Sequence, residues 1–214
     1  MKTIRGHRTQ AHAAGMLVAL LAVGALALGG FPGGAAAKKP KKFQFDLVVS
    51  AAAQPCLPNA TGQVTLQSVG DNQRMRVDVG GLPKKTAFTL FVLQVPTAPF
   101  ATSWYQGDIE TNGSGRGGLN LLGIFSTETF AFAPAERDAP QTHPGVDAAT
   151  NPPTAPVHMY HLGVWFSDPA DAVAAGCPGN TTPFDGDHVA GIQVLNTSNA
   201  GTEAADGPLG QFTP

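Results

Sequence analysis

The sequence is short of charge, of cysteine and of the motifs that mark several large enzyme classes. Asp, Glu, Lys and Arg make up 13% of its 214 residues, and only two cysteines occur. It has no H-E-x-x-H, no C-x-x-C and no G-x-S-x-G motif. Residues 113–117, Gly-Ser-Gly-Arg-Gly, do not have the G-x-S-x-G spacing. These absences argue against zinc hydrolases and against hydrolases built on a serine nucleophile elbow.

The chain also lacks an apolar run long enough to span a membrane. Its longest run, residues 16–28, falls well short of the roughly 20 residues that a spanning helix needs. Basic residues precede the run, and a glycine-rich break and Ala35-Ala36-Ala37 follow it, which is typical of a secretory signal peptide. We therefore predict that residues 1–37 are a signal peptide cleaved after Ala37. The mature chain would be secreted, without a transmembrane anchor.

Basic residues become scarcer still once that segment is removed. Cleavage would take away three of the 13 basic residues and none of the 15 acidic ones, which changes the net charge from −2 to −5. Four of the remaining lysines lie in residues 38–42, a predicted basic linker, so the part that follows carries −9. Because nucleic-acid binding depends on neutralising phosphates, we predict no nucleic-acid partner. The lysines are either a solvated stub or a contact for an anionic cell-envelope polymer.

The two cysteines are Cys56 and Cys177. In an oxidising compartment a disulfide is the usual state of such a pair, and we predict that they are bonded. Free thiols or a metal dithiolate are the alternatives. A bond between them would tie an early loop to a late one.

Alternation of apolar and polar residues predicts a fold made of short strands. Gly- and Pro-rich turns separate these strands, and no repeat or alternation of strands with long helices occurs. We predict an all-β fold, an antiparallel β-sandwich of about eight strands, with a small β-barrel as the alternative. The strands are expected within residues 43–53, 61–69, 75–79, 88–95, 104–109, 119–125, 157–166 and 190–195.

Three other segments complete the expected organisation. One short helix is predicted near residues 168–176, with Asp168 as its N-cap, Pro169 in its first turn and Gly176 after its end. The stretch 131–156 holds six prolines and little apolar pattern, which is typical of a long loop. The β-sandwich domain is expected to span 43–197. Residues 198–214 are polar and glycine-rich, and we predict a flexible C-terminal tail.

Part of the sequence resembles a known family. Residues 47–55 (LVVSAAAQP), 59–62 (NATG) and 77–82 (VDVGGL) resemble the start of CHRD domains, which are secreted β-sandwich modules of chordin and of many bacterial proteins. The family usually continues with a strand that contains histidine, whereas this chain continues FTLFVL at 88–93. Residues 99–108 and 161–166 are similar to uncharacterised secreted proteins of soil-type bacteria. The resemblance implies bacterial origin, export and a β fold, and no particular activity.

One segment has the spacing of a calcium loop. Asp108, Glu110, Asn112 and Ser114 place oxygen ligands at alternate positions, with a glycine at the sixth position. The twelfth position is Leu119, where such a loop needs a glutamate. The alternative is an ordinary β-hairpin in which Asn112-Gly113 supplies a positive φ. Calcium is the one cofactor that the sequence suggests.

Aromatic residues suggest a ligand surface. Trp104, Tyr105 and Trp165, with Asp108 to bond hydroxyl groups, could stack on sugar rings if they are exposed on one side; the alternative is that they pack in the core. The histidines at 143, 158, 161 and 188 show no metal spacing, because His158 and His161 would point to opposite faces of a strand.

Together these observations predict a secreted or envelope-associated, non-enzymatic β-sandwich module that binds or supports a surface ligand. A cell-envelope polymer or a surface protein is the expected partner. The competing hypothesis is an extracellular polymer-degrading hydrolase with Asp108 and Glu110 as its acids. Residues i and i+2 of a strand lie about 7 Å apart on one face, a separation that suits glycosidase carboxylates.

Overall fold

The computed structural model describes residues 41–131, 156–185 and 188–214. These residues belong to one unit, Lys39–Pro214. The predicted signal peptide (1–37), most of the basic linker, most of the loop 131–156 and His143 lie outside the described residues.

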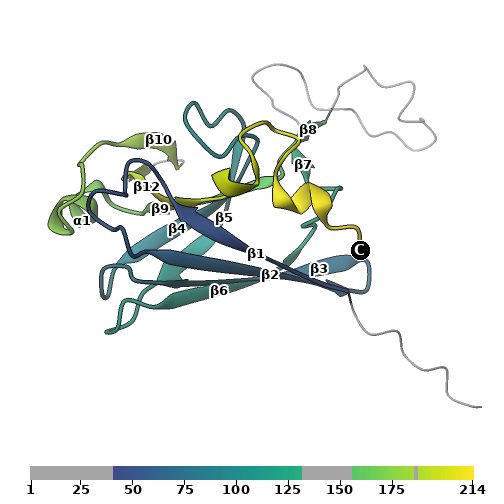
Figure 1. Ribbon diagram of the computed structural model, residues 1–214, viewed down its shortest axis with the longest axis horizontal. Helices are drawn as coiled ribbons and strands as arrows, with labels where there is room; N and C mark the ends of the chain where they lie inside the picture. The colour runs from purple at the N-terminus through teal and green to yellow at the C-terminus, as the bar shows by residue number, and fades with distance from the viewer. Residues whose placement is uncertain (1–40, 132–155, 186–187) are drawn as a thin grey trace, which may run out of the picture. The chain divides into compact units, whose positions relative to one another are not determined.

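Twelve β-strands occur in the described residues. Their bounds are β1 Lys42–Val49, β2 Thr61–Val69, β3 Asn72–Gly80, β4 Ala87–Leu93, β5 Ser103–Glu110, β6 Gly117–Gly123, β7 Phe130–Ala131, β8 Val157–His158, β9 His161–Phe166, β10 Thr182–Asp185, β11 His188–Ala190 and β12 Gln193–Asn196. Eight of them form one sheet in the order β5-β4-β9-β12-β1-β2-β3-β6 (Figure 1), while β7 pairs with β8 and β10 with β11. Every pairing is antiparallel, so the all-β prediction is confirmed.

The large sheet folds back on itself through β1. Residues Lys42 to Leu47 pair with β2, whereas Val48 and Val49 pair with β12, so the strand passes from one layer to the other. The layer β1-β2-β3-β6 therefore continues into the layer β12-β9-β4-β5. Since β5 and β6 follow each other in the chain and lie at the two ends of the sheet order, the sandwich is nearly a closed barrel.

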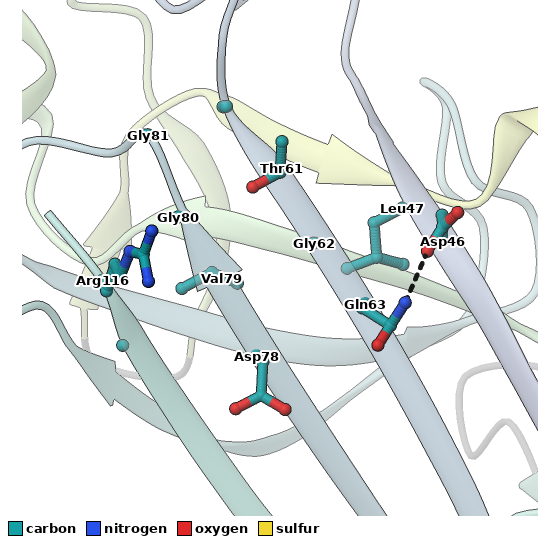
Figure 2. A pocket seen from close by; sticks show the side chains of 12 residues that line it. Asp46, Leu47, Thr61, Gly62, Gln63, Asp78, Val79, Gly80, Gly81 and Arg116 are labelled. Atoms are coloured by element: carbon teal, nitrogen blue, oxygen red, sulfur yellow. Dashed lines mark hydrogen bonds between the residues drawn. The ribbon is translucent and has the colours of Figure 1, made fainter.

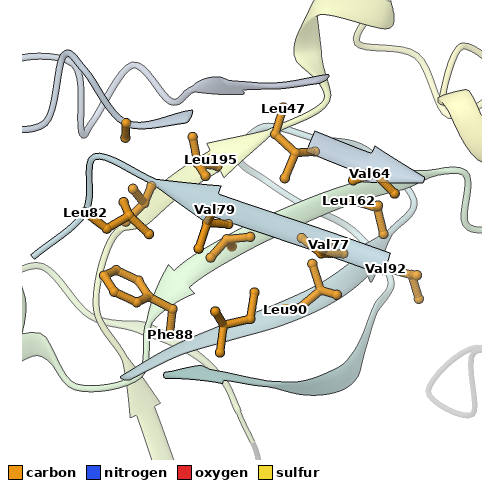
Figure 3. Packing of buried hydrophobic residues seen from close by; sticks show 14 of the residues in the cluster. Leu47, Val64, Val77, Val79, Leu82, Phe88, Leu90, Val92, Leu162 and Leu195 are labelled. Atoms are coloured by element: carbon orange, nitrogen blue, oxygen red, sulfur yellow. The ribbon is translucent and has the colours of Figure 1, made fainter. Parts of the chain in front are cut away.

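The core lies between these two layers. Alternate residues such as Val64 on β2 and Val77 on β3 face Leu90 on β4 and Leu162 on β9, and all four are fully buried (Figure 3). Burying one such side chain stabilises the fold by about 1.5–3 kcal/mol. The alternation that predicted the strands is therefore the pattern of inward-facing side chains.

Strand β4 is buried on both faces. Phe88, Leu90 and Val92 belong to the main core, while Phe91 and Leu93 form a second cluster on the other face with residues that include Trp165. This arrangement explains the nearly continuous apolar run of this strand, which lies between β5 and β9 in the sheet.

The short helix and the disulfide both match their predictions. Helix α1 spans Pro169–Ala174, Asp168 accepts a hydrogen bond from the backbone N–H of Ala170 at 2.7 Å, and Gly176 follows with φ of 76°. Cys177, just after the helix, is bonded to Cys56 with a Cα–Cα distance of 5.3 Å. Among the residues described, no helix has the length and apolar character needed to cross a membrane.

The predicted strand 157–166 is interrupted at Met159 and Tyr160. The N–H of Met159 donates to the carbonyl of Thr129, and the carbonyl of Tyr160 accepts from the N–H of Leu209. These two residues thus bond to neighbouring loops instead of extending the sheet, which separates β8 from β9.

The C-terminal segment differs from the flexible tail that we predicted. It contains two 3-10 helices, η2 Ser198–Ala200 and η3 Pro208–Gln211, and the side chains of Leu209 and Phe212 are buried in the main core. The polar, glycine-rich composition of 198–214 hid these two apolar anchors. Packing of the segment also places the C-terminus beside the start of β1, where Lys41 donates to the carbonyl of Thr213.

Candidate functional site

One turn connects strands β5 and β6, and the two strands lie in close contact next to it. A Cβ atom on Gly117 would lie 2.8 Å from the carbonyl oxygen of Glu110, and one on Gly107 would lie 3.0 Å from a methyl group of Leu119. At Gly117 the near atom belongs to the backbone, so only glycine permits this approach of the two strands. No backbone ladder joins β5 to β6 in the described part of the chain, although both are edges of the same sheet.

A β-bulge then changes the faces of β5. Leu90 pairs with Gly107, but the next residue, Phe91, pairs with Tyr105, so Gln106 is the extra residue of the bulge. As a result Trp104 lies opposite Val92, on the face of the sheet that carries the main core.

A cleft opens at this end of β5 and β6. It has a volume of about 630 Å³ and is lined by both strands, by the segment after β6 and by Met159. Its floor is apolar, because Val92, Phe125 and Met159 are buried core residues. We call it the Trp104 cleft.

The rim of the Trp104 cleft is apolar as well, and it is exposed. Trp104 is 62% exposed, Leu122 62%, Ile124 44% and Phe130 46%. Seven large apolar side chains are exposed in the described residues, and four of the seven line this one cleft. Soluble domains seldom gather exposed apolar side chains in this way unless the surface binds something.

Buried hydrogen bonds hold the segment after β6 in place. The side chain of Gln73, which is buried on β3, accepts from the N–H of Phe125 at 2.7 Å. The hydroxyl of Thr129 accepts from the N–H of Ser126 at 2.8 Å and donates to the carbonyl of Ile124 at 2.9 Å. The rim residue Ile124 and the floor residue Phe125 are thereby fixed before any ligand arrives.

The polar groups of the Trp104 cleft are few. Gln106, Thr129 and Glu128 line it, and Glu128 is the one ionisable residue among the lining residues that the structure describes. Nearby, the hydroxyl of Tyr160 donates to the carbonyl of Thr127 at 2.9 Å. Burial, and secondarily the negative charge of Glu128, raise the pKa of Tyr160. In its described part, the cleft thus offers a large apolar surface with a single negative charge at its edge.

The structure brings only one of the predicted aromatic ligand residues to this cleft. Tyr105 lies on the opposite face of β5, 47% exposed, with its ring 6.1 Å from that of Phe91. Trp165 is fully buried, and its ring packs edge-on against Phe91 at 5.5 Å and Phe100 at 5.0 Å. The residues predicted to bind a ligand therefore do not share one surface, and Trp165 packs as the core alternative predicted.

Asp108 and Glu110 are exposed on the outer face of β5, because Ile109 between them is buried in the core. Asp108 accepts a long hydrogen bond, 3.4 Å, from the hydroxyl of Thr89. None of the three cavities described here is lined by either carboxylate.

The remaining residues of the calcium-like segment form the tip of the β5–β6 hairpin. The side-chain oxygen of Asn112 accepts three hydrogen bonds. They come from the N–H of Ser114 at 2.8 Å, from the hydroxyl of Ser114 at 2.7 Å and from the N–H of Arg116 at 3.2 Å. The positive φ, 71°, falls at Gly115 and not at Gly113, as in a type I turn followed by a bulge. Within the described residues no cluster of three or more His, Cys, Asp or Glu side chains is arranged to hold a metal.

The two described histidines with placed side chains have different environments. His158 is exposed, and its Nδ1 lies 2.8 Å from the hydroxyl of Tyr160. His161 is fully buried, with Nδ1 2.9 Å from the hydroxyl of Thr197 and Nε2 2.8 Å from the carbonyl of Glu203. Burial lowers the pKa of His161, while the Glu203 carbonyl and the charge of Asp206 act in the opposite direction.

Another cavity, of about 710 Å³, lies over β1, β2 and β3 and is lined by both polar and apolar residues (Figure 2). Its acids already have partners: Gln63 donates to Asp46 at 3.3 Å, and Asp78 binds the guanidinium of Arg76 at 2.6 and 2.7 Å, which lowers the pKa of Asp78. Its acids are therefore already satisfied, and although Arg116 also lines it, no large apolar side chain is exposed among the described residues of its lining.

A further cavity, of about 650 Å³, has buried polar side chains in its lining. Gln193 donates to the carbonyl of Pro96 at 3.0 Å and accepts from Asn196 at 2.8 Å, and Ser50 donates to the carbonyl of Gln193 at 2.6 Å. Since these groups satisfy one another and no large apolar side chain is exposed in the described part of this lining, the Trp104 cleft is the stronger candidate site.

Leu122, Ile124 and Phe130 were missed from sequence. One signal was present, because the alternation of β6 breaks at Leu121-Leu122, which puts a leucine where an exposed polar residue is expected.

The assignment of the Trp104 cleft as the candidate site depends on its geometry alone. No protein-family model and no curated protein sequence matches the chain.

Proposed function

We propose that this chain is a secreted, non-enzymatic binding module and that the Trp104 cleft is its binding site. The observation that carries the proposal is the gathering of four exposed apolar side chains around one cleft, Trp104, Leu122, Ile124 and Phe130. A ligand that covers them would remove this surface from water, which is the main source of binding free energy.

The shape of the cleft suits this role. Its volume of about 630 Å³ lies within the range of roughly 300–1,000 Å³ found for ligand pockets. Its walls stand on strands and on a hydrogen-bonded segment, so little conformational entropy would be lost on binding. An apolar wall with few polar groups favours apolar ligands over charged ones.

Export of the module rests on two features. The signal-peptide pattern of residues 1–37 predicts secretion, and the Cys56–Cys177 disulfide fits an oxidising compartment. In that setting a surface protein or a cell-envelope polymer is the expected source of the ligand. The predicted resemblance to CHRD domains, which are secreted, would fit such an extracellular location and stays a prediction.

The proposal is tested by titrating the protein with 1-N-phenylnaphthylamine, a neutral probe whose fluorescence rises in apolar sites. We expect saturable binding to the unmodified chain and binding at least about tenfold weaker to Leu122→Ser, since a buried leucine contributes about 1.5–3 kcal/mol. Val173→Ser is the matched control, because Val173 is 60% exposed on α1, away from the lining residues. Equal affinity of the two variants, or no saturable binding at all, would refute the proposal.

The competing hydrolase hypothesis has no specific observation in its favour. Its acids, Asp108 and Glu110, are exposed on the outer face of β5. A hydrolase needs a cleft that holds the substrate against both carboxylates, and no cavity described here includes them.

A further inference from the structure

The two edges of the sheet differ in their protection. An exposed edge strand normally carries charges, proline or a bulge that stop another strand from pairing with it. Edge strand β5 has the bulge at Gln106 and the exposed acids Asp108 and Glu110. Strand β6, with the sequence GGLNLLG, has no charge and no proline, and its register with β3 is unbroken.

The unprotected edge and the Trp104 cleft occupy the same place. Leu121, Leu122 and Gly123 belong to β6 and also line the cleft. A molecule in the cleft would therefore meet an edge of β6 with which no described strand pairs, as well as an apolar surface. An extended peptide matches both features, since its backbone bonds to the edge while alternate side chains point to one side.

We propose that β6 accepts an extended segment of a partner protein as an added strand, with its apolar side chains in the Trp104 cleft. This inference rests on the proposed function of the cleft and names the class of its ligand.

Charge further specifies the segment. Among the described residues that line the cleft, Glu128 is the one with an ionisable side chain. Arg74 lies opposite Leu122 on β3, but β6 separates it from an added strand, and it is not part of the lining. A basic residue at the end of the added strand would pair with Glu128, so the segment should alternate apolar residues and end in lysine or arginine.

The probe for this inference is a synthetic peptide of seven residues, which alternates valine and threonine and ends in lysine. It is expected to pair with the end of β6 that lines the cleft, Leu121–Gly123, because β5 approaches Gly117 and Leu119 closely. It should displace phenylnaphthylamine from the unmodified chain and from Val173→Ser, and bind Leu122→Ser at least about tenfold more weakly. The same peptide ending in glutamate should bind roughly two- to fivefold more weakly, and Glu128→Gln should abolish that preference.

Strand addition is tested with two isomers of the lysine peptide, each N-methylated at one set of alternate residues. Only one set of N–H groups can face β6, so one isomer should bind at least about tenfold more weakly and the other close to the parent. Equal affinity of both isomers and the parent would overturn strand addition.

The other outcomes separate this inference from the proposed function. If phenylnaphthylamine binds the cleft and no peptide displaces it, the peptide assignment is wrong and the binding site stands. If neither probe binds, both fail. In a third case, a second copy of the chain occupies β6 in place of a partner segment, and light scattering of the chain alone tests this. If the chain is a dimer and Leu122→Ser converts it to a monomer, the assignment of a partner peptide is wrong.

Discussion

Trp104 and Trp165 lie on opposite faces of the same layer of the sheet. Trp104 pairs with Val92 on the core face, at the mouth of the cleft, while Trp165 pairs with Thr89 on the other face. The first is 62% exposed and the second is fully buried, and the chain has no further tryptophan. The two indole rings therefore report separately on the cleft and on the packed outer face.

The Cys56–Cys177 disulfide should contribute strongly to stability. It joins residues 121 positions apart, and the chain-entropy model assigns about 5 kcal/mol to a loop of that size. The double variant Cys56→Ala, Cys177→Ala should lose about that much free energy of unfolding in urea. Reductant should lower the stability of the unmodified chain and leave the double variant unchanged. If reductant has no effect on the unmodified chain, the bond is absent.

His161 should make stability depend on pH. Its pKa is lowered in the fold, so between about pH 6.5, where a free histidine titrates, and its lower folded value the unfolded state binds more protons. The contribution of neutral His161 to the free energy of unfolding is therefore complete above about pH 6.5, and it is lost as the pH falls through the folded pKa.

Urea unfolding between pH 4 and 8 checks this dependence. The decline at low pH should be smaller in His161→Gln and should persist in His158→Gln, whose histidine is exposed. An unchanged decline in His161→Gln would assign the pH dependence to other groups.

The C-terminal segment should be part of the folded domain. Leu209 is fully buried in the main core, and its N–H donates to the carbonyl of Tyr160. Leu209→Ala should reduce the free energy of unfolding by about 2–5 kcal/mol. Val173→Ala, at an exposed site, should change it by less than about 0.5 kcal/mol. A flexible tail would instead make both variants neutral.

Two glycines with positive φ should respond differently to alanine. Gly70 has φ of 60° with nothing within 4 Å of a Cβ atom, so Gly70→Ala should cost about 1–2 kcal/mol from the backbone alone. Gly81 has φ of 67°, and a Cβ there would overlap the carbonyl oxygen of Asn59. Gly81→Ala should therefore be the more destabilising by at least about 1 kcal/mol. Similar unfolding free energies for both variants would mean that the loops relax freely.

The parts of the fold that were predicted correctly depend on local patterns. The alternation of Val64 with its polar neighbours identifies a strand, and Asp168 and Gly176 mark the ends of a helix, whatever the rest of the chain does. The Cys56–Cys177 pair was predictable because only two cysteines exist.

The site depends on relationships that are not local. One extra residue, Gln106, decides that Trp104 and not Tyr105 faces the core side, and a bulge leaves no clear mark in the sequence. The cleft also needs the meeting of β6 with Met159, which follows from the order of strands in the sheet. The same limit applies to Leu209, which is buried in the main core and whose N–H donates to the carbonyl of Tyr160, distant in the sequence.

The most direct test of the Trp104 cleft is a titration followed through the two indole N–H signals in a nitrogen-15 correlation spectrum. Trp104→Phe assigns the signals, since the one that disappears belongs to Trp104. With phenylnaphthylamine added to the unmodified chain, we predict that the Trp104 signal shifts in a saturable way while the Trp165 signal stays in place. A probe that binds and leaves the Trp104 signal unmoved would contradict the assignment of the binding site to this cleft.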